Sequence, residues 1–363
     1  MSEKIHPQKL KAFPVQLIDI PNGLLVKRGC TEFKISGSEA RTVVETILAA
    51  AADEGAALDD ICELFPPSAR RIVATLVEQL AVRRILVNGD EAISMTNRLE
   101  TSLDIFYWHF GKQSEPALSR LNRYRFTILG VTSVARQLVA SLADLQITNF
   151  EVIDYPLLRN LRMYDDTGTV AADHWPSRLK SPLDYEEWTK GLQSSPLDCV
   201  IATSDFGYSP AISEWNEFCV RRNCHFLPAV LHQMIGYVGP LVIPGETACF
   251  ECLRARQNAH IDNPSLHRAA EERAFEGQII TGFHPSMTSI LGSITAFELE
   301  RVYGAFMPKP QVGRVITINL LNTEVKSRKV MKVPRCPACS PLLARSGVTP
   351  YKDAFIHSSD EHL

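Results

Sequence analysis

The sequence predicts an α/β protein in which a small N-terminal module is followed by a doubly wound domain with a structural zinc clip. Three observations support this fold class. Residues 1–95 contain short alternating segments typical of strands, followed by amphipathic helical stripes. From Tyr124 onward, apolar strands alternate with helical patterns, which is typical of a parallel sheet covered by helices. Two C-x-x-C couples, 84 positions apart (336 minus 252), offer four thiolates to one metal.

The first module, residues 1–95, is predicted to be a winged helix. Alternating apolar residues between positions 13 and 36 predict three short antiparallel strands. Three amphipathic helices follow, and the first is predicted to begin at a capping box formed by Ser36 and Glu39. Residues 85–89 are apolar and end in Asn-Gly, so they can form the wing.

The charge of this module decides between two uses of a winged helix. Residues 1–95 contain 11 Lys plus Arg and 13 Asp plus Glu, a net charge of −2 (11 minus 13), which is unfavourable for binding phosphates. The same shape can accept an extended peptide, which adds a strand to the sheet edge. A peptide-binding groove is predicted between residues 31–36 and the third helix. The residues predicted to contact the peptide are Phe33, Ile35, Val73, Leu76 and Val77. Ile72 of the third helix is also expected to face inward.

Residues 96–120 are predicted to form a connector, and residues 121–363 the second domain. The connector contains an aromatic helix at residues 105–110, which we expect to pack against a domain or a subunit. The second domain begins with a strand, a tight turn and a helix, the unit that holds nucleotide phosphates at a helix N-terminus. Only the first glycine of G-x-G-x-x-G is present, at Gly130, and the β-branched Thr132 stands where a phosphate needs close backbone approach. The sequence therefore predicts a weakened phosphate cradle.

The two C-x-x-C couples supply Cys249, Cys252, Cys336 and Cys339. Four thiolates make a closed tetrahedral zinc site without an open coordination position, so the predicted role of the metal is structural and not catalytic. An apolar stretch and a Pro-Gly turn precede the first couple, as is usual for a zinc knuckle at a strand end. An iron–sulfur cluster uses the same ligands at closer spacing, and two unrelated buried thiol pairs would need no metal.

Composition limits the class of protein further. The chain has 363 residues, of which 45% are hydrophobic and 22% charged, so it is long enough for two domains. It has no apolar run of about 18 residues that could span a bilayer and no apolar signal segment at its start, so we expect a cytoplasmic protein without a membrane partner. The net charge of −3 does not indicate nucleic-acid binding. The cysteines outside the couples show no disulfide spacing and are expected to be reduced: Cys30, Cys62, Cys199, Cys219 and Cys224.

These motifs resemble the ubiquitin-activating-enzyme-like superfamily, the Rossmann-like adenylating fold of the ThiF/MoeB type. The resemblance covers about residues 121–340 and is most specific in G-P-L-x-x-P-G-x-x-x-C-x-x-C, residues 239–252. Asn160-Leu161 and Thr203-Ser204-Asp205 also carry it. Chains of this kind with an N-terminal winged-helix peptide clamp process ribosomally made peptides. They include the adenylating enzyme of microcin C-type pathways and the partner proteins of YcaO-type cyclodehydratases.

The resemblance implies a nucleotide site at the turn of Gly130. In active members an acid corresponding to Asp154 holds the ribose, a residue corresponding to Asn160 contacts phosphates, and an acid corresponding to Asp205 holds magnesium. Adenylation depends on several charges aimed at the transferring phosphoryl group, and one lost contact typically costs about 3 kcal/mol.

Several of the charges that the family uses are out of place in this sequence. The arginine after Asn-Leu is shifted by one position, to Arg162, and Arg98 precedes the expected place of the connector arginine. Lys180 is a weak substitute for the family's lysine. We therefore expect a vestigial nucleotide site with no catalytic residue. The alternative for Asp154 and Asp205 is that they are strand-end and loop acids that act as caps or surface charges.

The predicted function is recognition without independent catalysis. The protein is expected to bind the leader of a precursor peptide and to dock a separate YcaO-type cyclodehydratase that makes azolines or azoles, as in bacteriocin biosynthesis. Structural zinc is the expected cofactor, and neither ATP nor magnesium is expected to be used. A dehydrogenase and a second copy of the chain are further expected partners. The alternatives are an ATP-dependent peptide-adenylating enzyme and a winged-helix regulator of transcription.

Overall fold

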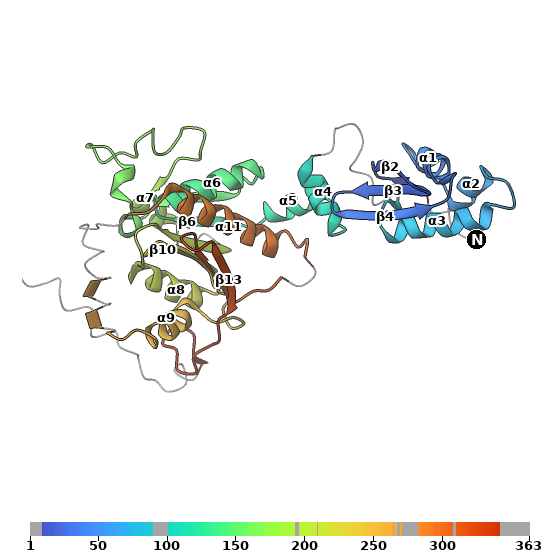
Figure 1. The fold of residues 1–363 in the computed structure, drawn as a ribbon. Coiled ribbons are helices and arrows are strands. Elements are labelled where there is room, and N and C mark those ends of the chain that lie inside the picture. Colours follow the sequence, from blue (N-terminus) through green and yellow to red (C-terminus); the bar gives the residue numbers. More distant parts are fainter. Residues whose placement is uncertain are drawn as a thin grey trace, which may run out of the picture. The chain divides into compact units, whose positions relative to one another are not determined.

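The computed structural model describes residues 9–89, 101–192, 196–208, 210–263, 265–266, 269–270, 282–307 and 310–341. The chain divides into two compact units, Met1–Ala117 and Leu118–Leu363 (Figure 1). Each unit has its own apolar core and is described by itself. Among the described helices, none combines the length and apolar character that crossing a lipid bilayer requires.

The N-terminal unit contains two small antiparallel sheets. One has the strand order β2-β3-β4, and the other pairs β1 with β5. Its strands are β1 (Leu10–Ala12), β2 (Gln16–Ile20), β3 (Gly23–Arg28), β4 (Thr31–Ser36) and β5 (Leu86–Asn88). Its helices are α1 (Ala40–Ala50), α2 (Leu58–Glu63), α3 (Arg70–Val82) and α4 (Ser102–His109), and α5 (Ser114–Leu121) crosses the boundary between the units. The three predicted strands and three predicted helices form in the predicted order.

Two local predictions for this unit are wrong. The capping box at the start of α1 does not form, because a turn follows β4 and the helix begins after Glu39, whose side chain makes no cap hydrogen bond. Ile72 faces outward and is 73% exposed, because it lies one position away from the buried stripe of Val73 and Val77.

The second unit is built on an eight-stranded sheet with the order β13-β12-β11-β10-β9-β6-β7-β8. Neighbours from β10 to β8 run parallel, and β11, β12 and β13 are added antiparallel. The strands are β6 (Phe126–Leu129), β7 (Phe150–Asp154), β8 (Leu183–Asp184), β9 (Cys199–Ser204), β10 (His225–His232), β11 (Ile235–Val238), β12 (Arg314–Asn319) and β13 (Glu324–Lys329). The predicted strands at residues 126–129 and 150–154 are confirmed.

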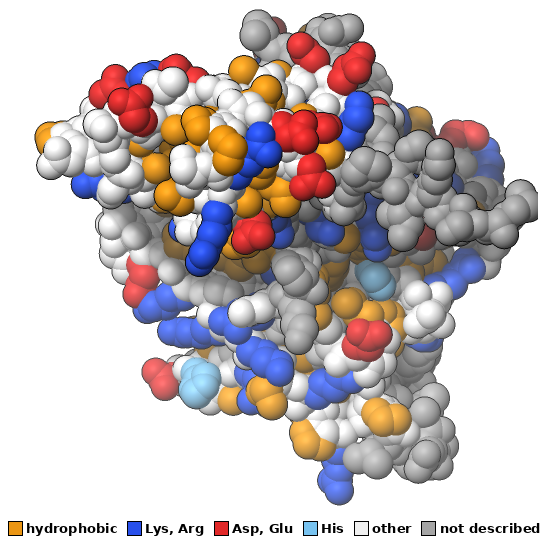
Figure 2. All heavy atoms as spheres, turned by 90° about the vertical axis from the view of Figure 1, so that its right-hand side faces the viewer, with side chains coloured by type: hydrophobic (Ala, Val, Ile, Leu, Met, Phe, Trp, Pro, Cys, Tyr) orange, Lys and Arg blue, Asp and Glu red, His pale blue; other side chains and the backbone are white. Residues whose placement is uncertain are grey.

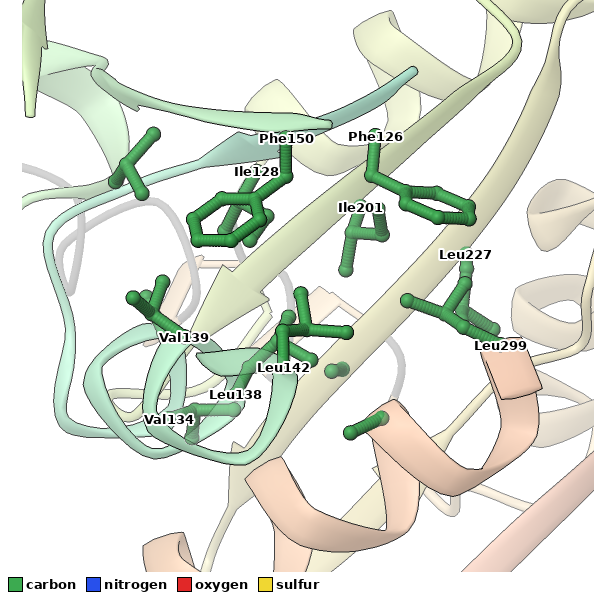
Figure 3. Packing of buried hydrophobic residues seen from close by; sticks show 14 of the residues in the cluster. Phe126, Ile128, Val134, Leu138, Val139, Leu142, Phe150, Ile201, Leu227 and Leu299 are labelled. Carbon is green, nitrogen blue, oxygen red and sulfur yellow. The ribbon is translucent and has the colours of Figure 1, made fainter. Parts of the chain in front are cut away.

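Helices cover both faces of this sheet (Figure 1). On one face α6 (Ser133–Asp144) packs beside α11 (Pro285–Tyr303), and α8 (Pro210–Arg222), α9 (Phe250–Asn258) and α7 (Tyr185–Gly191) contribute to the apolar cluster of the other. Figure 3 shows Val134, Leu138 and Leu142 of α6 near strand residues Phe126 and Phe150. These α6 residues recur every four positions and so form one apolar stripe. The predicted doubly wound, Rossmann-like domain is thus confirmed for the second unit.

Candidate nucleotide, metal and peptide sites

Gly130 forms the turn between β6 and α6, at the carboxyl edge of the parallel strands. Its φ is +100°, and a Cβ at this position would lie 2.7 Å from the carbonyl oxygen of Leu158 and 3.1 Å from that of Thr203. Glycine avoids both the unfavourable φ and these overlaps. The chain therefore reaches the N-terminus of α6 by the sharp turn on which a nucleotide site of this fold depends.

Thr132 is the N-cap of α6. Its hydroxyl oxygen accepts a hydrogen bond from the backbone N–H of Ala135 at 3.0 Å and donates to the hydroxyl of Thr203 at 2.9 Å. Thr203 in turn donates to the carbonyl of Leu129 at 3.0 Å. Both threonines are fully buried. The β-branched side chain that weakens the sequence motif is thus used to close the helix end.

Asp205 lies against the same helix end and is 1% exposed. Its Oδ2 accepts hydrogen bonds from the backbone N–H of Ser133 at 2.7 Å and from Nδ2 of Asn160 at 2.9 Å, and its Oδ1 has no hydrogen-bond partner among the described residues. Burial raises the pKa of Asp205, whereas the two hydrogen bonds favour the ionised carboxylate. The positive end of α6, which suits an anion, therefore already faces a carboxylate of the protein.

Asp154 ends β7 in a network of its own. Arg159 donates to its two oxygens, from Nε at 2.6 Å and from Nη2 at 3.0 Å, and the hydroxyl of Tyr164 donates to Oδ1 at 2.5 Å. Burial, with the adjacent carboxylate, raises the pKa of Tyr164 well above its usual value. A ribose hydroxyl would have to compete with these three hydrogen bonds.

Arg159 and Tyr164 are the site residues that sequence reasoning missed. The sequence pattern pointed to Arg162 as the arginine that follows Asn160-Leu161. In the structure the backbone N–H of Arg162 donates to Oδ1 of Asn160 at 3.1 Å. The signal for Arg159 was its position five residues after an acid at a strand end, within reach of a bidentate ion pair.

Lys180 is not near the nucleotide edge. Its ammonium donates to the carbonyl oxygens of Thr148 and Phe150, at the start of β7, whereas Asp154 is at the end of that strand. Four residues of strand separate the two ends by about 13 Å. Arg98, the candidate connector arginine, lies outside the described residues.

The four predicted metal ligands converge in the second unit. Cys249 and Cys252 lie at the start of α9, and Cys336 and Cys339 lie in the turn that follows β13. The Sγ atom of Cys249 is 3.9 Å from that of Cys252 and 3.5 Å from that of Cys336, and those of Cys252 and Cys339 are 3.6 Å apart. All four lie within 4.8 Å of one another. Zinc with bonds of about 2.3 Å to sulfur places tetrahedral sulfurs about 3.8 Å apart, so the arrangement fits a metal such as zinc.

The backbone N–H of Val333 donates to Sγ of Cys252 at 3.3 Å, which is the kind of outer hydrogen bond that orients a metal ligand. Within the described ranges this is the only group of three or more Cys, His, Asp or Glu side chains that could share an ion.

The five residues predicted to contact a peptide lie on β4 and α3. Val73 and Val77 are 2% and 1% exposed and belong to the core of the unit. Phe33, Ile35 and Leu76 are half-buried and pack around a second, smaller cluster. A partner can therefore contact Phe33, Ile35 and Leu76, whereas the two valines are covered as part of the core.

The second unit combines a doubly wound sheet, a four-cysteine group and an acid at the end of each of two parallel strands, and residues 169–338 match the ThiF family. The predicted resemblance to the ThiF/MoeB-type superfamily is thus confirmed. Protein HesA of Leptolyngbya boryana is 27% identical over 124 residues, which are 34% of this chain and 38% of that protein. The chain therefore spans well under half of the length of this curated relative.

Solved structures of peptide-modifying proteins share the fold. The microcin C7 biosynthetic enzyme MccB in complex with N-formylated MccA matches with a TM-score of 0.64 at 16% identity, over 92% of this chain and 100% of that chain. E. coli MccB with AMPCPP and MccA matches with 0.63 at 16%, over 91% and 99%. A heterocyclase in complex with substrate and cofactor matches with 0.56 at 16%, over 92% of this chain and 40% of that chain.

Proposed function

We propose that this protein binds the leader of a ribosomally made precursor peptide and presents it to a separate YcaO-type cyclodehydratase, without using ATP itself. The observation that carries the proposal is the edge strand β4, whose half-buried Phe33 and Ile35 pack around the same apolar cluster as Leu76 of α3. A winged-helix peptide clamp presents such an edge to an extended peptide, whose backbone adds a strand while alternate side chains enter apolar pockets.

The register of the β3–β4 hairpin identifies the free backbone groups. Arg28 pairs with Thr31 across a two-residue turn, and the pair that closes such a turn is hydrogen-bonded. Because hydrogen-bonded and non-hydrogen-bonded pairs alternate, Phe33 also bonds to β3, and the backbone N–H and C=O groups of Glu32 and Lys34 point away from the sheet. A leader strand would pair with these two residues.

The nucleotide edge supports the absence of ATP chemistry. Asp205 occupies the positive end of α6 through Ser133, and Asp154 is held by Arg159 and Tyr164. A magnesium-bound triphosphate at this place would have to displace the contacts of Asp205 to Ser133 and Asn160 before the carboxylate could hold the metal. The ring-forming chemistry is therefore assigned to the partner enzyme.

The heterocyclase comparison is consistent with this division of labour. The shared fold covers 40% of that chain, so the rest of the heterocyclase lies outside the fold that this protein has. We propose that a YcaO-type enzyme supplies the remaining part here, that zinc occupies the four-cysteine group, and that a second copy of the chain and a dehydrogenase are further partners. Bringing leader and enzyme together raises the effective concentration of the substrate.

Lys34→Pro is expected to weaken binding of a fluorescently labelled, co-encoded leader peptide by at least about tenfold, because it removes an outward backbone donor and hinders strand addition. The Lys34 N–H makes no bond to β3 in the register above, so the melting temperature should stay unchanged. The measurement is fluorescence anisotropy on the full chain. Lys34→Ala is the matched control and should bind within about twofold of the wild type. Equal leader affinity of Lys34→Pro and the wild type would reject the proposed β4 site.

The second candidate, an ATP-dependent peptide-adenylating enzyme, is favoured by the match to MccB over nearly its whole length. The two candidate functions predict different results for the wild type and for the Asp205→Ala variant. We expect the wild type to show no heat of ATP–magnesium binding in calorimetry and no pyrophosphate release. We also expect Asp205→Ala to lower the free energy of unfolding by about 1–2 kcal/mol through loss of the contact to the α6 end, with leader affinity retained. Pyrophosphate release that the wild type shows and Asp205→Ala lacks would establish the adenylating enzyme instead.

A further inference from the structure

The N-terminal unit contains a second candidate site, away from β4. A cavity of about 640 Å³ lies between the end of α3, strand β5, α4 and the start of α5, and its volume is in the range of ligand sites. Apolar walls come from residues such as Phe13, Leu86 and Trp108. Among the described residues that line it, the polar side chains belong to cations and amides, and none is acidic. The cavity is therefore amphipathic with a positive electrostatic bias.

Arg84 and Lys112 supply the positive charge. Among the described residues, neither side chain forms an ion pair. The guanidinium of Arg84 packs on Gly111, where a Cβ would lie 1.8 Å from Nη1, and Nε1 of Trp108 donates to the carbonyl of Arg84 at 3.0 Å. The glycine makes room for the guanidinium, and the indole holds its backbone. Two cations without a carboxylate are complementary to an anionic ligand.

Strand β5 runs along the cavity with one free edge. The backbone N–H of Phe13 donates to the carbonyl of Ile85 at 2.9 Å, and the N–H of Gly89 donates to the carbonyl of Lys9 at 2.8 Å. Hydrogen-bonded and non-hydrogen-bonded residue pairs alternate along an antiparallel ladder. These two bonds therefore make Leu86 and Asn88 the non-hydrogen-bonded residues of β5, whose backbone groups point away from β1. In the described part of the chain no strand pairs with that edge of β5. Both residues line the cavity, but Leu86 is 1% exposed and Asn88 is half-buried, so the accessible backbone groups are those of Asn88.

We propose that this cavity binds an extended acidic peptide by strand addition to β5 at Asn88, with a peptide carboxylate on Arg84 and Lys112 and an apolar side chain against the half-buried Phe13. Each part of the ligand corresponds to one observation on the described residues. The β5 edge at Asn88 selects an extended backbone, the two cations without an ion pair select a carboxylate, and the aromatic ring selects an apolar neighbour. The inference does not depend on leader binding at β4, because it concerns different residues.

Exposed cations elsewhere on the N-terminal unit provide control variants for the proposed β5 cavity site. Figure 2, which looks onto the N-terminal unit, shows hydrophobic side chains with basic and acidic ones around them. Arg71 on α3 and Lys34 on β4 are exposed cations that do not line the cavity. Their glutamine variants test whether binding depends on the general charge of the unit or on Arg84 and Lys112.

The test uses the full chain and a labelled, end-blocked pentapeptide of alternating leucine and glutamate, followed by anisotropy. Binding is expected with a Kd below about 1 mM, and Lys112→Gln or Arg84→Gln should weaken it about tenfold by removing a charge-assisted contact. Arg71→Gln and Lys34→Gln should have no effect. A peptide with glutamine for glutamate should lose affinity to the same extent, and methylation of alternate backbone nitrogens should abolish binding.

Three outcomes would overturn the proposal: no binding up to about 1 mM, unchanged affinity in both Lys112→Gln and Arg84→Gln, or loss of probe binding in Lys34→Pro. The last result would place the acidic probe in the β4 groove. Failure of the β4 proposal has a separate signature, since Lys34→Pro would then leave the affinity for the co-encoded leader unchanged while the pentapeptide still depends on Lys112.

Discussion

Cys336→Ser is expected to remove the metal from the protein and to destabilise it more than loss of the buried carboxylate of Glu151 or Asp205. Zinc binding contributes about 10–16 kcal/mol in zinc-finger peptides, whose fold depends on the metal. In this protein the ligand segments also pack in an apolar cluster, so part of the structure survives without the ion. We therefore expect the free energy of unfolding to fall by at least about 4 kcal/mol.

Metal analysis and thermal unfolding check this prediction together. The wild type should contain one zinc per chain, and a chelator that removes it should lower the melting temperature to that of Cys336→Ser. Cys30→Ser is the control, because Cys30 is exposed and belongs to the N-terminal unit. A wild-type protein without metal, or with iron and sulfide in place of zinc, would contradict the assignment.

Glu151→Ala is expected to lower the free energy of unfolding by about 3 kcal/mol. Glu151 is buried on β7 and accepts hydrogen bonds from three side chains: Thr127 at 2.8 Å, Trp188 at 2.9 Å and Arg125 at 2.8 Å. These residues join β6, β7 and α7. Its removal leaves a buried hydroxyl, an indole N–H and a partly buried guanidinium without an acceptor, which costs more than the lost bonds themselves.

Urea unfolding followed by circular dichroism gives the measurement. Glu187→Ala is the matched control, because Glu187 forms an ion pair with Lys190 in which both side chains are about 70% exposed, and such pairs contribute about 0–1 kcal/mol. If Glu151→Ala is no more destabilising than Glu187→Ala, the buried network does not stabilise the sheet.

The elements that could be predicted from the sequence are those with strong local periodicity. Strands β6 and β7 have the predicted ends because most of their residues are apolar and both strands are buried on two faces. The error at Ile72 arose because apolar residues occupy adjacent positions on α3, and periodicity alone does not decide which of two neighbours faces the core. The capping box at Ser36 failed because the S-x-x-E pattern does not reveal a turn between strand and helix.

The candidate sites were predictable to different degrees. The four cysteines could be identified because C-x-x-C spacing itself restricts the chemistry, and they converge as expected. The acids Asp154 and Asp205 were identified as strand-end residues, but their partners could not be. Arg159 reaches Asp154 only through the turns that follow β7, and Asp205 reaches Ser133 only because β9 lies next to β6 in the sheet.

By itself, the sequence determined the strand, turn, helix and strand that begin the second unit, the four-cysteine group and the single glycine of the turn, since each depends on spacing within a short segment or on residue type. Only the tertiary structure decided that the positive end of α6 faces Asp205 and that Val73 and Val77 belong to the core. It also decided that, among the described residues, one edge of β5 has no partner strand and lies beside two cations without an ion pair. These features depend on which segments, distant along the chain, become neighbours, and on which backbone groups the sheet pairing leaves unused.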